Sequence, residues 1–399
     1  MIEQIKAIAE AETQNMTALR RELHRHPELS FHEERTTETI CRILTESNIP
    51  YRRAGHRGIV ARLESGLPGP NIAFRADFDA LPIQEETGLD FASEEAGKMH
   101  ACGHDAHTAV LAGLARTMSK HRELLRGTAT FIFQDAEETP PGGAAPMVRD
   151  GCLDDVDKIF GLHVSDELDT GVVGVCSGKY MAASDTFEII FSGKGGHGSR
   201  PCDGDDTISA MALAISTINA IPSRFLPAYR DAVITVCSVN GGSSHNVLPA
   251  KCTLMGTVRT FESETAQTIK SLIERCAQNA AGLFHTAYEF CYHEGYPVLV
   301  NAEAPCQTVR SAARLLGQKC MTIPPTAVAE DFSVYLQNVP GAFFRMGIRN
   351  PAKDTAYSLH SGKFNIDEDA LPAALMTFWC IYLLETGQIH AQPDGGRED

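Results

Sequence analysis

Residues 99–107 hold a dense set of candidate metal ligands. They read Met-His-Ala-Cys-Gly-His-Asp-Ala-His, with three histidines, one cysteine and one aspartate around a glycine. Thiolate, imidazole and carboxylate groups are the side chains that bind zinc and related transition metals. Cys102 and His104 are two residues apart, so in an extended segment their side chains point to the same side. This spacing predicts a metal site where a loop enters a helix.

Pairs of carboxylates follow two of the expected strands. Asp77 and Asp79 come after the first of these strands, and Glu137 and Glu138 after the second. Of two adjacent glutamates, one can bind a metal ion while the other acts as a general base on the attacking water. Capped turns and glutamate pairs on the surface are common, so either pair alone would be a weak signal.

Two further histidines lie at comparable positions. His163 follows another expected strand, and His360 lies in the segment Ser-Leu-His-Ser. A lone histidine is more often a packed or surface residue, and a lone cysteine is more often a small buried hydrophobic residue. Their joint occurrence is harder to dismiss. One ion needs three or four ligands, so five candidates indicate two ions that share a bridging ligand. The candidate ligands are Cys102, His104, Glu138, His163 and His360.

The elements that must position these residues alternate between strands and helices. Apolar periodicity predicts helices at 1–23, 33–47, 106–121, 143–151, 302–317 and 368–386, and strands at 58–63, 71–76, 128–134, 158–161 and 342–346. Alternation of this kind favours a mainly parallel sheet whose strand ends meet at one edge. The predicted fold class is therefore α/β, with a mixed, mainly parallel sheet flanked by helices.

The pattern changes between residues 183 and 297. Expected strands at 185–191, 232–239, 252–260 and 286–292 enclose helices at 205–220 and 262–282. The order strand-helix-strand-strand-helix-strand is that of a small split βαβ sandwich. We therefore expect residues 1–182 and 298–399 to form one catalytic, metal-binding domain. Residues 183–297 would form an inserted α+β domain.

Length and composition exclude several classes of function. A chain of 399 residues is too long for one ordinary core, and its net charge of −16 argues against nucleic acid or a membrane as a partner. No stretch approaches the ~20 apolar residues of a membrane span. The first residues lack a signal-peptide pattern, and the 12 cysteines contain no C-x-x-C pair. We expect a reducing, cytoplasmic setting.

Seven motifs resemble the amidohydrolase branch of the aminoacylase/carboxypeptidase metallopeptidase superfamily. This branch includes hippurate hydrolase and the indole-acetyl-amino-acid hydrolases. The resemblance runs nearly from end to end. The motifs are residues 99–107, Phe-Gln-Asp-Ala-Glu-Glu (133–138), Gly-Leu-His-Val (161–164), Gly-Lys-Gly-Gly-His-Gly-Ser (193–199), Gly-Thr-Val-Arg-Thr-Phe (256–261), Ala-Glu-Asp-Phe-Ser (329–333) and Leu-His-Ser (359–361).

The resemblance implies a zinc-peptidase-like catalytic domain with an inserted ferredoxin-like domain that serves as lid and dimerisation domain. It implies two divalent metal ions per subunit, of zinc, manganese, cobalt or nickel, because the ligand types accept all four. The implied ligands are Cys102, His104, Glu138, His163 and His360.

The resemblance also implies roles for residues around the metals. Glu137 would be the general base and acid, and Asp77 would lie behind the ligands. His197 would polarise the scissile carbonyl, often across a dimer interface. Asn246 and Arg259 would hold the substrate carboxylate, although a structural salt bridge is the alternative for Arg259.

The implied activity is metal-dependent hydrolysis of N-acyl amino acids to a carboxylate and a free amino acid, by a homodimer or a dimer of dimers. A dipeptidase or carboxypeptidase of the same superfamily is the alternative. A non-catalytic binding protein on this fold is a second alternative, but it would be expected to lose Glu137 or a ligand, and none is missing. A structural zinc or thiol-redox protein is disfavoured by the lack of paired cysteines.

Three positions depart from the usual pattern of the branch. Cys202 follows Pro201 where a histidine is usual, and Asp135 occupies the place of a proline. His245 precedes Asn246 where an apolar or aromatic residue is familiar. These departures bear on the preferred acyl group and amino acid and leave the reaction class unchanged.

Overall fold

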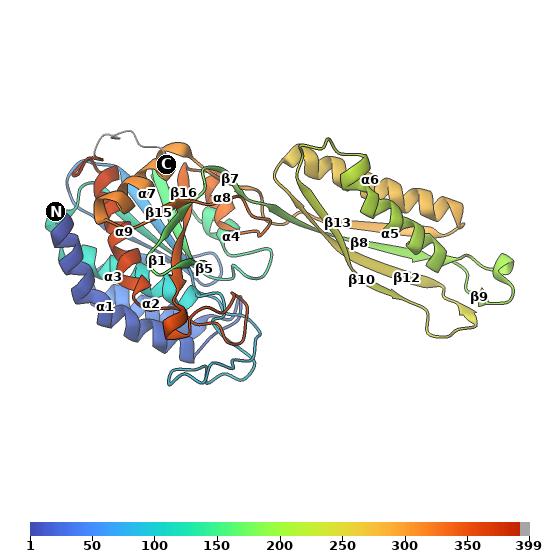
Figure 1. Cartoon of the computed structure of the whole chain (residues 1–399), viewed down its shortest axis with the longest axis horizontal. Coiled ribbons are helices and arrows are strands. Elements are labelled where there is room, and N and C mark those ends of the chain that lie inside the picture. The colour runs from blue at the N-terminus through green and yellow to red at the C-terminus, as the bar shows by residue number, and fades with distance from the viewer. Residues whose placement is uncertain (392–399) are drawn as a thin grey trace. The chain divides into compact units, whose positions relative to one another are not determined.

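The structure, a computed structural model, describes residues 1–391 and divides into two compact units. Unit 1 comprises Met1–Gly178, Val300–Pro324 and the chain from Asp331 onward. Unit 2 comprises Lys179–Leu299 and Pro325–Glu330. Figure 1 labels the helices and strands of both units.

Unit 1 is built on an eight-stranded sheet with the strand order β1-β2-β4-β3-β5-β16-β6-β15. The strands are β1 (Tyr51–Ala54), β2 (Gly58–Glu64), β3 (Asn71–Asp77), β4 (Thr128–Gln134), β5 (Lys158–Asp169), β6 (Val173–Val175), β15 (Cys320–Thr322) and β16 (Gly341–Arg349). β3 pairs in parallel with β4 and β5, and β5 pairs in parallel with β16. β2 joins β4, and β6 joins β16, in antiparallel fashion. The centre of the sheet is therefore parallel and its flanks are mixed.

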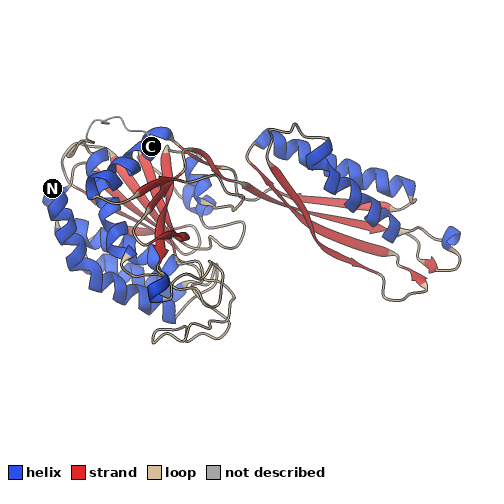
Figure 2. Ribbon diagram, in the orientation of Figure 1, coloured by secondary structure: helices blue, strands red, loops and turns tan. Residues whose placement is uncertain are grey.

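Helices cover the sheet of unit 1, as Figure 2 shows. They are α1 (Ile2–Arg25), α2 (Glu34–Glu46), α3 (His104–Lys120), α4 (Ala144–Arg149), α7 (Glu303–Leu316), α8 (Phe332–Leu336) and α9 (Ala370–Glu385), with short 3-10 turns at Arg122–Leu124 and Pro351–Lys353. Every residue of β3 is buried, so both faces of the sheet are covered. α1 packs against α3 and α9, while α8 contacts β5 and β16.

Aromatic side chains fix the helices on the sheet. The Phe74 ring on β3 lies 5.0 Å from that of Phe378 on α9 and 6.2 Å from that of Phe160 on β5. Trp379 is fully buried, and its indole N–H donates a 2.9 Å hydrogen bond to the Thr117 hydroxyl on α3. The ring contacts join α9 to the sheet, and the Trp379 hydrogen bond joins α9 to α3, the helix whose first residue is His104.

Unit 2 contains a four-stranded antiparallel sheet with the order β10-β12-β8-β13. Its elements are β8 (Ala183–Ser192), β9 (Gly196–His197), a 3-10 turn (Pro201–Asp203), α5 (Thr207–Arg224), β10 (Ala232–Gly241), β11 (Val247–Leu248), β12 (Lys251–Thr260), α6 (Ser263–Leu283) and β13 (Ala287–His293). The first and third strands lie in the middle of the sheet, which is the ferredoxin-like arrangement. α5 and α6 pack on one face around a core that includes Ile189 and Ile273. The short strands β7 (Gly178–Met181) and β14 (Leu299–Asn301) pair with each other.

The predicted fold class, a mainly parallel α/β sheet flanked by helices with an inserted ferredoxin-like domain, is confirmed. One element differs in a way that matters for the site. β5 continues to Asp169 and does not end at Gly161, because it pairs in parallel with β16 along its length. His163 therefore lies inside a strand, where we expected it after the strand end.

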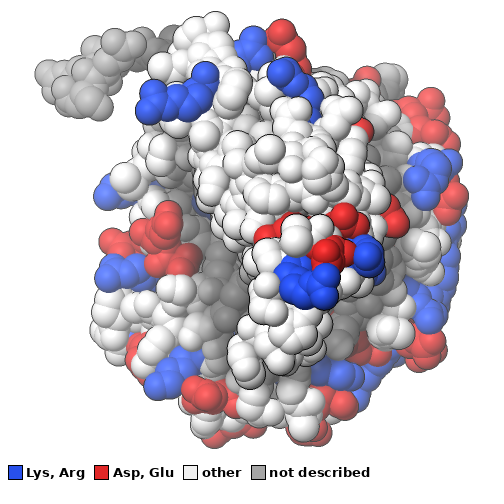
Figure 3. Space-filling view, turned by 90° about the vertical axis from the view of Figure 1, so that its right-hand side faces the viewer, with Lys and Arg blue, Asp and Glu red and all other residues white. Residues whose placement is uncertain are grey.

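Two further features concern the surface charge and the apolar character of the helices. On the face drawn in Figure 3, acidic and basic side chains are interspersed, so the negative net charge does not gather there in one patch. Within residues 1–391, no helix combines the length and apolar character needed to cross a membrane.

Candidate metal centre

A left-handed glycine lets two candidate ligands approach one point. Gly103, the residue before α3, has φ of 86°. A Cβ atom at this position would lie 2.5 Å from Val164 Cγ2, so both the backbone conformation and the space require glycine. Cys102 and His104 flank this turn, and their side chains are buried. The turn brings a thiol and an imidazole to the same place.

Two groups of candidate ligands share Cys102. Its Sγ atom lies 3.3 Å from His163 Nε2 and 3.4 Å from His360 Nε2. His360 Nε2 also lies 3.5 Å from Glu138 Oε1. The ligand atoms of Cys102, His104 and His163 lie within 4.8 Å of one another, and so do those of Cys102, Glu138 and His360. The structure thus brings together all five ligands expected from the sequence, in an arrangement that fits two ions with the thiolate between them.

Two buried atoms of this centre have no hydrogen-bond partner within residues 1–391. They are His104 Nε2 and Glu138 Oε1, which lie 3.9 Å apart. Buried polar atoms nearly always have partners, so two unpaired ligand atoms that face one another indicate a cation site. Soft thiolate, imidazole and carboxylate ligands suit divalent transition metals. The residues present therefore fit a dinuclear metal centre.

Asp79 sets the orientation of His104. His104 Nδ1 donates to the main-chain oxygen and to Oδ1 of Asp79, at 3.0 and 3.1 Å. Since Nδ1 carries the proton, the lone pair of Nε2 faces the centre. Asp79 Oδ2 accepts hydrogen bonds from the Glu138 main-chain N–H at 2.9 Å and from the Ser30 hydroxyl at 2.8 Å. Asp79 thus fixes the positions of two candidate ligands, His104 and Glu138. We did not assign this role from the sequence, although the alternation of Asp77 and Asp79 places both side chains on one side of the segment.

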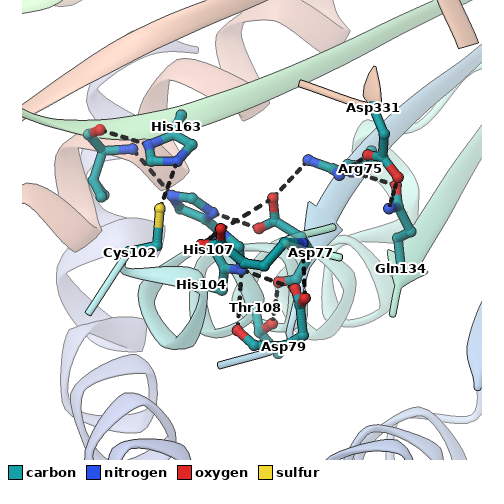
Figure 4. A network of polar contacts seen from close by, with 12 residues as sticks. Arg75, Asp77, Asp79, Cys102, His104, His107, Thr108, Gln134, His163 and Asp331 are labelled. Atoms are coloured by element: carbon teal, nitrogen blue, oxygen red, sulfur yellow. Dashed lines mark hydrogen bonds and ion pairs between the residues drawn. The ribbon is translucent and has the colours of Figure 1, made fainter. Parts of the chain in front are cut away.

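Asp77 holds a different histidine (Figure 4). His107 Nδ1 donates to Asp77 Oδ1 at 2.5 Å, and His107 Nε2 accepts from the Val164 main-chain N–H at 3.0 Å. Ligand atoms of Asp77, His104 and His107 also lie within 4.8 Å of one another. Because both ring nitrogens of His107 are already hydrogen-bonded, His107 is not available as a ligand. Through Val164, the Asp77–His107 pair fixes the main chain beside His163.

Arg75 supports Asp77 from behind. Its guanidinium donates to Asp77 Oδ2 at 2.7 Å, to Asp331 Oδ1 at 2.8 Å and to Gln134 Oε1 at 2.8 Å. Burial raises the pKa of the Asp77 carboxyl, but the charges of Arg75, His104 and His107 outweigh it and hold that pKa well below its usual range. Figure 4 shows this network running from Gln134 to His107.

The turn after β4 places Glu137 beside the centre. Glu137 is buried, and a carboxylate oxygen lies within 4.8 Å of ligand atoms of His104 and Glu138. Ala136, the preceding residue, has a left-handed φ of 49°, and its N–H donates to Glu33 Oε1 at 2.9 Å. Burial and the neighbouring Asp79 carboxylate raise the pKa of Glu33 to about 8.

The remaining candidates lie in unit 2, in two separate places. His197 on β9 pairs with Val247 on β11, and the Gly198 N–H donates to the Asn246 main-chain oxygen at 2.7 Å. His197 and Asn246 are therefore neighbours. Arg259 lies on β12, opposite Ser184 of β8, and its Nη1 donates to the Thr257 hydroxyl and to the Val258 main-chain oxygen.

Asp79→Asn is expected to weaken metal binding about 10- to 100-fold, because the amide presents an N–H group where Asp79 now accepts hydrogen bonds. Metal affinity can be measured by competition with a chromophoric chelator. Asp90→Asn, at an exposed position, is the control and should leave the affinity unchanged. An unaltered affinity in Asp79→Asn would contradict the orienting role of this carboxylate.

Glu33 predicts a pH dependence of stability. Its pKa is about 8 in the folded protein and 4.5 in the reference state, so between these values the folded state binds one more proton than the unfolded state. The free energy of unfolding then falls as pH rises through this window, by up to ~1.4 kcal/mol per pH unit. In chelator-treated protein, the melting temperature of Glu33→Gln minus that of the wild type should increase from pH 5 to pH 8. If the melting temperatures of the two proteins change with pH in parallel, the raised pKa of Glu33 is contradicted.

The sequence of the chain is similar to those of proteins from a known family. The sequence model of peptidase family M20/M25/M40 matches residues 73–381. N-acetylcysteine deacetylase from Bacillus subtilis (strain 168) is 38% identical over 372 residues, which are 92% of this chain and 96% of that protein. Thermostable carboxypeptidase 1 from Saccharolobus solfataricus is 35% identical over 357 residues, which are 88% of this chain and 91% of that protein.

A solved structure agrees with the sequence relatives. The Bacillus subtilis YXEP protein, described as a dinuclear metal binding peptidase from the M20 family, is similar with a TM-score of 0.83 and 36% identity, over 95% of this chain and 100% of that chain. The resemblance noted from the motifs is thus confirmed. The chain belongs to peptidase family M20/M25/M40 and is a metal-dependent amide hydrolase.

Proposed function

We propose that the protein cleaves the amide bond of N-acyl amino acids and releases a carboxylate and a free amino acid. The observation that carries this proposal is the pair of ligand groups that share Cys102, with Glu137 beside them. Similarity to N-acetylcysteine deacetylase supports an acylated amino acid as the substrate. Similarity to a thermostable carboxypeptidase favours the alternative, cleavage of peptides from the carboxyl end.

The proposed ligands of two divalent ions are Cys102, His104, Glu138, His163 and His360. When bound, zinc, manganese, cobalt or nickel ions make the attacking water acidic and help to stabilise the negative charge of the tetrahedral state. Burial and the Glu138 carboxylate raise the pKa of the Cys102 thiol, so metal binding must displace its proton. Metal affinity should therefore depend on pH.

Glu137 is the proposed general base and acid. An amide resists hydrolysis because its carbonyl is weakly electrophilic and its nitrogen leaves poorly unless it is protonated. Glu137 takes a proton from the attacking water and returns it to the leaving nitrogen. Its closeness to His104 and Glu138 supports this role, because water activation and proton transfer must occur at the same place. Asp77 contributes by holding His107 and the main chain next to His163.

His197 and Arg259 are proposed to contact the substrate from opposite ends of unit 2. On β12, Lys251 pairs with Ser192 at one end and Arg259 pairs with Ser184 at the other. Lys251 and Arg259 are eight residues apart, or about 27 Å of extended strand. His197 follows Ser192 in the chain and Asn246 precedes Lys251, so both residues lie at the Lys251 end of β12. Figure 1 shows β9, the strand of His197, beyond one end of the sheet. One small substrate cannot touch both His197 and Arg259 of the same unit 2.

This separation favours a homodimer, or a dimer of dimers, in which His197 of the partner subunit donates to the developing oxyanion. Arg259 is proposed to hold the substrate carboxylate. Asn246, the neighbour of His197, would contact the substrate together with His197. Unit 2 also exposes large apolar side chains that a second copy would cover. They include Phe225, Tyr229 and Leu283.

The substrate class can be tested with a panel of amides. Metal is removed from the protein with a chelator, and separate samples are reconstituted with zinc, manganese, cobalt or nickel. Each sample is then assayed with acetyl, benzoyl and long-chain acyl amino acids and with dipeptides. We expect metal-dependent release of amino acid from at least one acyl class. Cleavage of dipeptides alone would favour the peptidase alternative. If none of the compounds is cleaved although the protein binds metal stoichiometrically, a non-catalytic binding protein is favoured.

Glu137→Gln serves as the matched variant in this panel. The amide keeps the size of the side chain but cannot move a proton, so kcat should fall by about 10²- to 10⁴-fold while metal content stays at the wild-type level. If Glu137→Gln retains most of the wild-type activity, Glu137 is not the general base.

Mixed dimers test the role of His197. Glu137→Gln and His197→Ala should each be nearly inactive alone. After subunit exchange, the mixture should recover about a quarter of the wild-type activity, because half of the dimers are mixed and each mixed dimer has one complete site. No recovery despite proven exchange, or a fully active monomer in solution, would show that His197 does not act across subunits.

A further inference from the structure

The segment 28–33, between α1 and α2, is bonded to both turns that carry the site. The Ala80 N–H donates to the Glu28 main-chain oxygen at 2.8 Å, directly after Asp79. The Ser30 hydroxyl donates to Asp79 Oδ2. At its other end, Glu33 Oε1 accepts the 2.9 Å hydrogen bond from the Ala136 N–H, one residue before Glu137. A single short segment therefore braces the turn of Asp79 and the turn of Glu137.

Ala136 is held in an uncommon backbone conformation. Its φ of 49° lies in the left-handed region, which residues with a Cβ atom rarely adopt and which persists only where the surroundings enforce it. Two hydrogen bonds enforce it here. Glu33 accepts from the Ala136 N–H, and the Gly143 N–H donates to the Ala136 main-chain oxygen at 3.1 Å. The direction in which Glu137 leaves the turn depends on this conformation.

Among residues 1–391, the hydrogen bond from the Ala136 N–H is the one that the Glu33 carboxyl accepts from another residue. The side chain is fully buried, and within residues 1–391 its second oxygen, Oε2, has no hydrogen-bond partner. A buried polar group without a complete set of partners is costly, so its presence calls for a reason. Burial, with the Asp79 and Asp135 carboxylates, raises the pKa of this carboxyl to about 8, so it is mostly neutral near pH 7. A neutral carboxyl can be imitated closely by an amide.

We propose that Glu33 is a positioning residue for the general base. Its Oε1 atom, by holding the Ala136 N–H, keeps the turn after β4 in the left-handed conformation that places Glu137 beside His104 and Glu138. The effect on turnover rests on the proposed role of Glu137. Catalytic groups must be held within a fraction of an ångström, so loss of this one bond should act mainly on kcat.

Three substitutions separate hydrogen bonding from charge and size. Glu33→Gln keeps an acceptor oxygen at the same reach, and its kcat should stay within about threefold of the wild type. Glu33→Asp keeps a carboxyl but is one methylene too short, and Glu33→Leu keeps only the bulk. Both should lose about 10- to 100-fold in kcat, with KM and metal content near the wild-type values.

Thr37→Val is the matched control. The Thr37 hydroxyl donates to the main-chain oxygens of Glu33 and Arg57, at 2.6 and 3.1 Å, so its hydrogen bonds do not involve Ala136. This variant should lower the melting temperature while leaving kcat unchanged. If kcat falls in proportion to the melting temperature across all four variants, Glu33 only stabilises the fold and does not position Glu137.

Hydrogen exchange of the Ala136 amide gives a readout that does not need a substrate. Protection should be retained in Glu33→Gln and lost in Glu33→Asp and Glu33→Leu. If Glu33→Leu does not fold, the pair Glu33→Gln and Glu33→Asp decides. Equal protection in that pair, or a Glu33→Gln variant as slow as Glu33→Asp, would overturn the proposal. If no amide in the panel is cleaved, the proposed function fails, but the exchange result still tests the bond.

Discussion

The hydrogen bond from His104 Nδ1 to Asp79 is the interaction on which the rest of the centre depends. It fixes the tautomer and the direction of one ligand, and the same carboxylate accepts the main-chain N–H of Glu138, another ligand. Asp79 follows the end of β3, His104 begins α3 and Glu138 follows β4. The parallel pairing of β3 with β4 brings the ends of these two strands together. The fold thereby places His104 and the main chain of Glu138 within hydrogen-bonding distance of the Asp79 carboxylate.

The burial of so many ionisable groups is sustained by nearly complete pairing. Arg75 donates hydrogen bonds to three acceptors, and Asp77 accepts one from His107, which in turn accepts a main-chain N–H. In a medium of low polarity such a network is rigid when every member has a partner. Two ligand atoms of the centre, His104 Nε2 and Glu138 Oε1, have no hydrogen-bond partner among residues 1–391, and they are informative because they lie where the ligand groups converge.

Local sequence patterns predicted most elements that carry the ligands. β4 was expected at its observed bounds, 128–134, because an apolar run of that length between turn residues suits a buried strand. The short strands β1, β6 and β15 were missed, because each forms only through pairing with a neighbour in the sheet. His163 was expected after a strand for the same reason, since the length of β5 is set by β16.

Within the site, residue types indicated the ligands, but hydrogen bonding assigned the supporting residues. Asp77 and Asp79 differ little in sequence context, and only the structure shows that Asp79 holds His104 while Asp77 holds His107. The contact of Glu33 with Ala136 joins residues about a hundred positions apart, and nothing in the local pattern of either residue indicates it.

Anomalous diffraction from crystals of the metal-loaded protein would locate the bound ions and identify their ligands. We expect two ions per chain, one bound by Cys102, His104 and His163 and the other by Cys102, Glu138 and His360, with Asp79 still hydrogen-bonded to His104. A single ion that avoids Cys102, or an ion bound by His107 and Asp77, would contradict this expectation.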